Sequence, residues 1–202
     1  MFFDEIINHT DFDRSVEKII PEFRERFSLP KIYQLGLVVP NVEAAALSLE
    51  KKGVAPFFIA AGSPAFWIER EQKKIFKGKL GISHYHGIEL ELLEPGEGSD
   101  FYCRSLNKYN GIVLQHLGFL VDDVDAWVSK FNTEGFATWV RGGNKIGPAK
   151  TQFAYMDTVE KAGLIIEFFS RRSFGLKWWP LGAIFRLIAR YQKWSGIRSL
   201  TF

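Results

Sequence analysis

An internal repeat constrains the fold of this chain more than any other feature of its sequence. YQLGLVVPNVEA (33–44) aligns with QHLGFLVDDVDA (115–126) at an offset of 82 residues, and the same offset carries Gly53 onto Gly135. A second match, GIELEL (87–92) with GLIIEF (163–168), has an offset of 76. A constant period of this kind indicates one structural unit that is present twice.

Each copy predicts a strand, a helix and further strands. The first apolar, β-branched run of each copy ends at Pro40-Asn41 or Asp122-Asp123, whose side chains can cap the next helix. We expect these helices near 42–52 and 124–134, each closed by its glycine. Strands are expected near 32–39, 55–60, 75–84, 87–94, 112–121, 136–141, 151–157 and 163–170. The fold class is therefore α+β, with two tandem βαβββ modules.

The repeat divides the chain into five segments. Residues 1–30 form an N-terminal helical extension, in which Phe12, Val16, Ile19, Phe23 and Phe27 lie at helical spacing with Pro21 between them. The other segments are a first module (31–94), a linker with a possible short helix at 100–109 (95–111), a second module (112–170) and a basic amphipathic tail (171–202).

Charge is concentrated in the tail. The whole chain carries +3, whereas residues 171–202 hold seven Lys and Arg and no acid, so residues 1–170 carry −4. The tail predicts an amphipathic helix at 180–194 that docks on the module or on a dimer mate; contact with a membrane surface or an acidic ligand is the alternative. No nucleic-acid motif accompanies it, so we expect no nucleic-acid partner.

The remaining composition favours a cytoplasmic protein. The single cysteine, Cys103, cannot form an intrachain disulfide, and acids occupy the positions where a signal peptide needs basic residues. The longest apolar run, 178–185, is far shorter than the roughly 20 residues that span a bilayer. We expect no transmembrane segment.

Four polar residues fall at equivalent positions of the two copies. The offset of 82 maps Gln34 onto His116, and the offset of 76 maps Glu91 onto Glu167. Strand alternation places Gln34 on the face of Gly36 and Val38, which is an apolar face of the sheet.

The duplicated pattern with these residues resembles the vicinal oxygen chelate superfamily, over about residues 31–170. The resemblance implies a glyoxalase fold, in which two modules form a cupped eight-stranded mixed sheet around one metal ion. It also implies one ligand on the first and one on the last strand of each module, which here are Gln34, Glu91, His116 and Glu167. Many relatives have His where Gln34 stands.

The donor set predicts one divalent metal ion. Two inward-facing carboxylates would repel each other unless a cation neutralised them. One imidazole nitrogen with three oxygens suits Zn, Ni, Co, Mn or Fe. The resemblance to extradiol dioxygenases is weakened, because they use His at the position of Gln34. Glyoxalase I can have this set of four, and GVAPFF (53–58) and ELLEP (91–95) look more like the methylmalonyl-CoA epimerase-like branch.

These relatives imply an isomerase or lyase that abstracts a proton beside a carbonyl, with Glu167 or Glu91 as the base and a CoA or glutathione thioester as substrate. The alternative is a metal-free module that binds and sequesters a small molecule. We further expect a metal site closed within one chain and a homodimer formed by sheet edges or the tail.

Five other residues are weaker candidates for substrate contact. They are Glu89, which shares the face of Glu91, His84 and His86 near a hairpin turn, and Lys145 and Lys150 in the glycine-rich segment 141–150, which could act as a lid. Each also has a purely structural explanation, as a rim ion pair, a turn residue or a loop residue.

Overall fold

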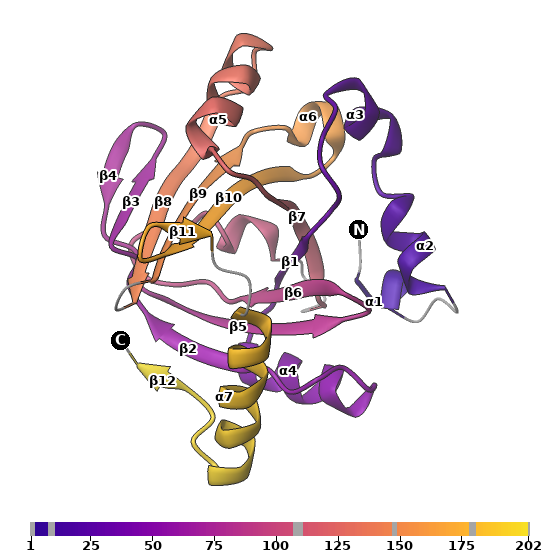
Figure 1. Cartoon of the computed structure of the whole chain (residues 1–202), viewed down its shortest axis with the longest axis vertical. Coiled ribbons are helices and arrows are strands. Elements are labelled where there is room, and N and C mark those ends of the chain that lie inside the picture. The colour runs from indigo at the N-terminus through magenta and orange to yellow at the C-terminus, as the bar shows by residue number, and fades with distance from the viewer. Residues whose placement is uncertain (1–2, 8–10, 107–110, 147–148, 178–180, 202) are drawn as a thin grey trace.

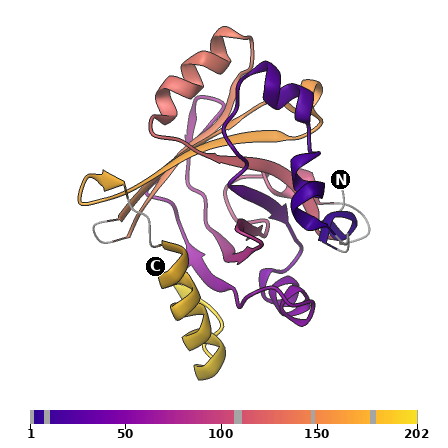
Figure 2. The same cartoon turned by 45° about the vertical axis from the view of Figure 1, so that its right-hand side comes forward.

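The computed structural model describes residues 3–7, 11–106, 111–146, 149–177 and 181–201. One strongly curled mixed sheet dominates it, with helices around its outside (Figures 1 and 2). The strands are β1 (Gln34–Val38), β2 (Phe58–Gly62), β3 (Phe66–Glu69), β4 (Gln72–Lys74), β5 (Gly78–Tyr85), β6 (Ile88–Leu93), β7 (Val113–Leu120), β8 (Thr138–Ile146), β9 (Ala149–Met156), β10 (Ile165–Ser173), β11 (Leu176–Lys177) and β12 (Leu200–Thr201). The helices are α1 (Phe3–Ile7), α2 (Phe12–Glu17), α3 (Pro21–Arg26), α4 (Val42–Lys51), α5 (Val124–Thr133), α6 (Val159–Ala162), α7 (Leu181–Ser195) and a 3-10 turn at Cys103–Ser105.

The two halves of the sheet have the same strand order. The first half runs β2-β5-β6-β1 and the second runs β8-β9-β10-β7. In each half the last strand pairs in parallel with the first, and β1 and β7 meet antiparallel at the centre. The prediction of a curled, mixed α+β sheet is confirmed, and each of the eight predicted strands overlaps one of these eight.

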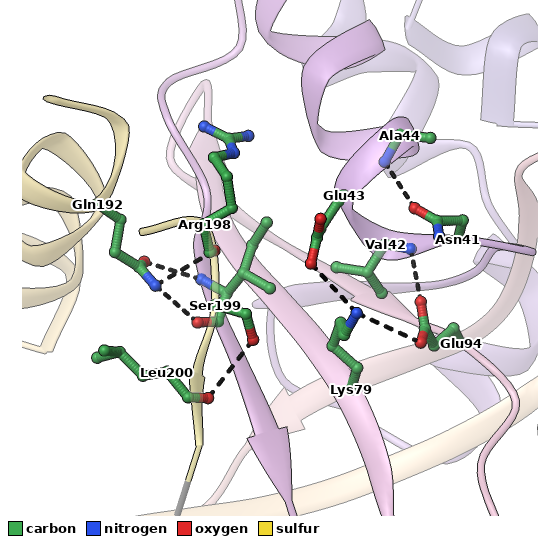
Figure 3. A network of polar contacts seen from close by, with 11 residues as sticks. Asn41, Val42, Glu43, Ala44, Lys79, Glu94, Gln192, Arg198, Ser199 and Leu200 are labelled. Carbon is green, nitrogen blue, oxygen red and sulfur yellow. Dashed lines mark hydrogen bonds and ion pairs between the residues drawn. The ribbon is translucent and has the colours of Figure 1, made fainter. Parts of the chain in front are cut away.

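The helix that follows the first strand of each half is capped as the repeat predicts. Asn41 accepts a hydrogen bond from the backbone N–H three residues on at 2.8 Å, and Asp123 does the same at 3.0 Å. Figure 3 shows the Asn41 cap beside Glu94, which accepts a second bond from the first turn of α4. A glycine with positive φ follows each helix, at +92° for Gly53 and +87° for Gly135.

The count of eight strands is wrong, because the sheet has twelve strands within the described residues. The largest addition is the β3–β4 hairpin, which lies between β2 and β5 in sequence but pairs with β8 at the far edge of the second half. Trp67 of β3 is buried and stacks on Phe76 at 4.6 Å. The hairpin thus follows β2 of the first half in sequence and extends the sheet beyond β8 of the second half.

The glycine-rich segment is not an irregular loop in its described residues. It forms the β8–β9 hairpin, in which β8 continues to Ile146 and the register passes through Gly142 and Gly143. A β-carbon on Gly142 would lie 2.2 Å from the ring of Phe153, and one on Gly143 would lie 2.6 Å from the ring of Phe66. These glycines therefore serve the close packing of two aromatic rings.

The N-terminal extension packs on the core as expected. Phe12, Val16, Ile19 and Phe27 are buried in the cluster on the outer face of the sheet. The helical segment is interrupted between α2 and α3 at Ile20, whose φ of 45° is left-handed. The predicted linker helix is reduced to the 3-10 turn among the described residues, and the end of its predicted range lies outside them.

The C-terminal tail folds back on the first half of the same chain. Helix α7 contacts β2 and β5, and β12 adds to the edge of β2 in parallel. The carboxamide of Gln192 accepts from Ile59 N at 3.1 Å and donates to Ile59 O at 2.8 Å (Figure 3). Of the described helices, none is long and apolar enough to cross a bilayer.

Candidate metal centre

The four predicted ligands lie on the four central strands, around two glycines. In the strand registers, Gly36 of β1 lies between Glu91 of β6 and His116 of β7. Gly118 of β7 lies between Gln34 of β1 and Glu167 of β10. These two glycines are themselves related by the offset of 82, so the site repeats the symmetry of the sequence.

Three of the four side chains meet directly. His116 Nε2 lies 3.3 Å from Glu167 Oε2 and 3.6 Å from Glu91 Oε2. The ligand atoms of these three residues all lie within 4.8 Å of one another, which is the spacing of a shared cation. The site is deeply placed, since His116 is fully buried and the other two side chains are almost so.

Each of the four residues carries one buried polar atom without a hydrogen-bond partner among the described residues. These atoms are Gln34 Oε1, Glu91 Oε2, His116 Nε2 and Glu167 Oε2. Buried polar atoms in folded proteins are almost always paired. Three oxygens and one imidazole nitrogen left open in this way fit a divalent metal ion.

The imidazole of His116 is oriented by its neighbour Gln115. A register shift in the β1–β7 pair follows Gly36, and Gln115 has no partner in that pair. Its Oε1 lies 3.1 Å from His116 Nδ1, while its Nε2 donates to Ser105 Oγ at 2.9 Å. With Nδ1 donating to Gln115, Nε2 is free to face the two carboxylates.

The electrostatics of the site favour a cation. Burial lowers the pKa of His116, but Glu167 and Glu91 outweigh burial and raise this pKa from 6.5 to about 9. Burial raises the pKa of Glu91, which contact with His116 offsets only in part. The charge that holds a proton on His116 would equally attract a metal ion in its place.

Gln34 is oriented by a buried ion pair. Its Nε2 donates to Glu89 Oε1 at 2.7 Å, which leaves its Oε1 free. Arg171 holds the same carboxylate through two bonds, of 2.8 and 2.7 Å. Burial raises the pKa of Glu89, but Arg171 outweighs it and lowers this pKa, so Glu89 stays ionised. Glu89 is therefore a positioning residue for Gln34 and not a free base.

Two tyrosines lie beside the site. The hydroxyls of Tyr102 and Tyr155 are 3.2 Å apart, and the Tyr155 ring lies 5.0 Å from that of His116. Burial, reinforced by the charges of Glu91 and Glu167, raises the pKa of both hydroxyls well above 10. Both therefore remain protonated and can donate a hydrogen bond.

A cavity of about 690 Å³ opens onto the site. Gln34, Glu91 and Glu167 line it together with Tyr102, Tyr155 and Arg171. Most of its remaining wall is aromatic or aliphatic, and part of that wall comes from the tail, through Phe185, Ile188 and Leu200. The volume is that of a site for a small organic molecule.

The five weaker candidates fall in different places. Lys150 lines the cavity, whereas Lys145, opposite it in the β8–β9 hairpin, is exposed and is not among the described lining residues. His84 is not among the described lining residues, and its Nε2 lies 3.6 Å from Glu89 Oε2. His86 has φ of 49° in the turn before Gly87 and is exposed near Asp13. It is therefore a turn residue.

Sequence reasoning missed Arg171, Gln115, Tyr102 and Tyr155. Strand alternation was a usable signal for Arg171, because residues 167, 169 and 171 share a face of β10. Gln115 directly precedes His116. No sequence signal indicated Tyr102, because it reaches the cavity from the segment predicted to be a linker.

Comparisons with known proteins concern the fold and the family of this chain. No curated protein sequence matches the chain. Among solved structures, hypothetical protein BH1468 from Bacillus halodurans C-125 superposes with a TM-score of 0.50 at 14% identity, over 71% of this chain and 95% of that one. A mutant of 4-hydroxymandelate synthase from Streptomyces coelicolor gives 0.50 at 14%, over 81% and 56%. Methylmalonyl-CoA epimerase from Mycobacterium tuberculosis gives 0.47 at 15%, over 69% and 86%.

At these identities the likeness to solved structures concerns the fold alone. The family is shown by sequence, because the profile of the Glyoxalase/Bleomycin resistance protein/Dioxygenase superfamily matches residues 33–155, well over half of the chain. The matched range contains Gln34, Glu91 and His116, and it ends before Glu167 and the tail. This chain belongs to the glyoxalase/bleomycin resistance protein/dioxygenase superfamily.

Proposed function

We propose that this protein is a divalent-metal-dependent isomerase or lyase that removes a proton next to a carbonyl group. The observation that carries the proposal is the set of four buried, unpaired donor atoms on four adjacent strands. Gln34, Glu91, His116 and Glu167 would hold the metal, which can be Zn, Ni, Co, Mn or Fe. A bound divalent ion would act as a Lewis acid on the carbonyl oxygen of the substrate.

The chain's own residues supply the rest of the chemistry. Glu167 and Glu91 both line the cavity, and either carboxylate can accept the proton from the carbon next to the carbonyl. The neutral hydroxyls of Tyr102 and Tyr155 can donate to a substrate oxygen. The apolar wall excludes water, which strengthens each of these polar interactions.

The cavity supports a substrate with an apolar part and an anionic part. The apolar wall suits a hydrocarbon portion, while Lys150, Arg172 and Lys177 are exposed cations on its rim. A thioester of CoA or glutathione combines a carbonyl with anionic groups that such a rim can bind. We therefore propose a thioester substrate of this class.

The test begins with metal analysis of protein purified without a chelating tag, where about one equivalent per chain is expected. The metal-loaded protein is then incubated in deuterium oxide with a panel of short acyl-CoA and glutathione thioesters, and exchange of the α-hydrogen is followed by mass spectrometry. Glu167→Gln should keep the fold and lose exchange. Glu160→Gln, an exposed change on α6, is the matched control and should exchange normally.

Two outcomes would redirect the proposal. Absence of bound metal at saturating concentrations would favour a binding module that sequesters a small molecule in the same cavity. Bound metal without exchange on any thioester would favour a different carbonyl substrate.

An extradiol dioxygenase stays disfavoured because Gln34 stands where those enzymes use His. The homodimer and the cytoplasmic location stay predictions.

A further inference from the structure

The tail helix α7 has a fixed inner face. Gln192 is bonded to both backbone groups of Ile59, and Phe185 stacks on Phe58 with ring centroids 4.9 Å apart. Ala189 is buried on the same side, and Phe185 and Ile188 line the cavity. These contacts decide which side of the helix faces outward.

The outer face of α7 carries large apolar side chains. Leu187 is 70% exposed, Tyr191 57% and Trp194 83%. Their spacings of four and three residues place them in one stripe along the helix. Ile197, just after the helix, is also exposed. Such a continuous apolar stripe on a surface marks an interaction site.

This stripe is flanked by positive charge. Arg186 and Arg190 are exposed, and no ion pair holds either of them within the described part of the chain. Lys193 and Arg198 approach Glu50 together, at 3.1 and 3.5 Å, so two cations share one carboxylate. Residues 171–202 contain no acid at all. The charge of this face is complementary to an anionic surface.

A helix with Leu, Tyr and Trp on one stripe and Arg beside it has the composition of an interfacial membrane helix. Indole and phenol rings favour the headgroup level of a bilayer, and arginines favour anionic lipids. A second copy of this chain is a poorer partner, because twofold pairing of the face would bring the arginines of both copies into one interface, and residues 171–202 hold no acid to offset them.

We propose that the outer face of α7, formed by Arg186, Leu187, Arg190, Tyr191 and Trp194, docks the protein on an anionic lipid bilayer. The helix lies in the interface and does not cross it. Because the opposite face of α7 supplies part of the cavity wall, docking brings the cavity next to the membrane surface; Figure 2 shows α7 at the periphery of the molecule. The proposal does not depend on the reaction proposed above.

The experiment is co-sedimentation of the full chain with vesicles of phosphatidylcholine alone or mixed with phosphatidylglycerol. We expect binding to the mixed vesicles only, weakened by added salt. The double variants Leu187→Gln/Trp194→Gln and Arg186→Gln/Arg190→Gln should each reduce binding at least about tenfold, because they remove the apolar and the electrostatic contribution separately.

Lys18→Gln/Lys31→Gln is the matched control, because both lysines are exposed and lie in or next to the N-terminal extension. This variant loses the same charge and should bind as the wild type does. All changes are on exposed side chains, so unchanged thermal unfolding verifies that the variants are folded.

Three results would overturn the proposal. They are no binding of the wild type to anionic vesicles, binding that the α7 variants leave unchanged, and equal loss in the lysine control. Sedimentation velocity without lipid tests the alternative partner, a second copy of this chain. A dimer that the two α7 variants abolish, with no vesicle binding, would assign the face to a second copy.

Discussion

Gly36 lies directly against the imidazole of His116. A β-carbon built on Gly36 would come within 1.8 Å of the ring, so no other residue fits here while His116 keeps its place. Gly36→Ala should therefore displace the ring and destabilise the fold by about 1–3 kcal/mol, the usual cost of overpacking a core. Chemical denaturation and calorimetric titration with Zn²⁺ should show loss of both stability and metal affinity.

Gly118→Ala is the symmetry-related comparison. Its new β-carbon would lie 2.7 Å from Oε1 and 2.9 Å from Cβ of Gln34, a milder clash than the one at Gly36. We expect a smaller loss of metal affinity than for Gly36→Ala, because the amide that moves is the weaker donor. A larger loss for Gly118→Ala would contradict the ranking.

Removal of the donors themselves should follow the same ranking. His116→Ala should reduce metal affinity far more than Gln34→Ala does, because imidazole is the strongest neutral donor of the set. Glu91→Ala should also weaken binding, because it removes one of the two carboxylates of the ligand set. Equilibrium dialysis with metal analysis gives the affinities. Equal losses for His116→Ala and Gln34→Ala, or full metal retention by Glu91→Ala, would count against the assignment.

The Glu89–Arg171 pair should matter for stability as well as for metal binding. Arg171→Met leaves Glu89, which is 1% exposed, without its counter-charge. We expect a loss of about 3–5 kcal/mol in the free energy of unfolding, typical of breaking a buried ion pair. The double variant Glu89→Gln/Arg171→Met should recover part of that loss, and urea denaturation of the three proteins measures it. No recovery would mean that the two residues act independently.

Gln192 should hold the tail on the sheet. Gln192→Leu would leave the backbone N–H and C=O of Ile59 without the bonds that Gln192 makes, at a cost of about 1–3 kcal/mol. Limited proteolysis should then release the C-terminal segment faster. Gln152→Leu, on an exposed position of β9, serves as the control. Unchanged cleavage of Gln192→Leu would show that the apolar contacts of α7 are enough to hold the tail on the sheet.

The central strands and the four donor positions were predictable because they depend on local patterns. Short apolar runs with a two-residue alternation predict strands, and the repeat gave two independent alignments for Gln34 with His116 and for Glu91 with Glu167. The positions of these residues around Gly36 and Gly118 also depend on the register between neighbouring strands. No local sequence pattern contains that register.

Contacts between distant segments could not be predicted. Strand alternation could place Arg171 on the face of Glu167, but it could not place Arg171 beside Glu89, whose carboxylate would be costly to bury alone. The hairpin of β3 and β4 was missed for a related reason, since its partner strand β8 lies in the other half of the chain. The glycine-rich segment was misread as a loop, because the rings that cover its glycines belong to Phe66 and Phe153.

The β3–β4 hairpin also has a consequence for how the chain folds during synthesis. Phe66 pairs with Gly143, so the edge of β3 that faces away from β4 has no partner until the second half has been made. A nascent chain that ends before β8 therefore exposes one unpaired strand edge, and Trp67 lacks its contact with Phe153. Contacts of such long sequence separation slow folding, and open edges favour association with other chains. The first half is thus expected to need its own second half to complete folding.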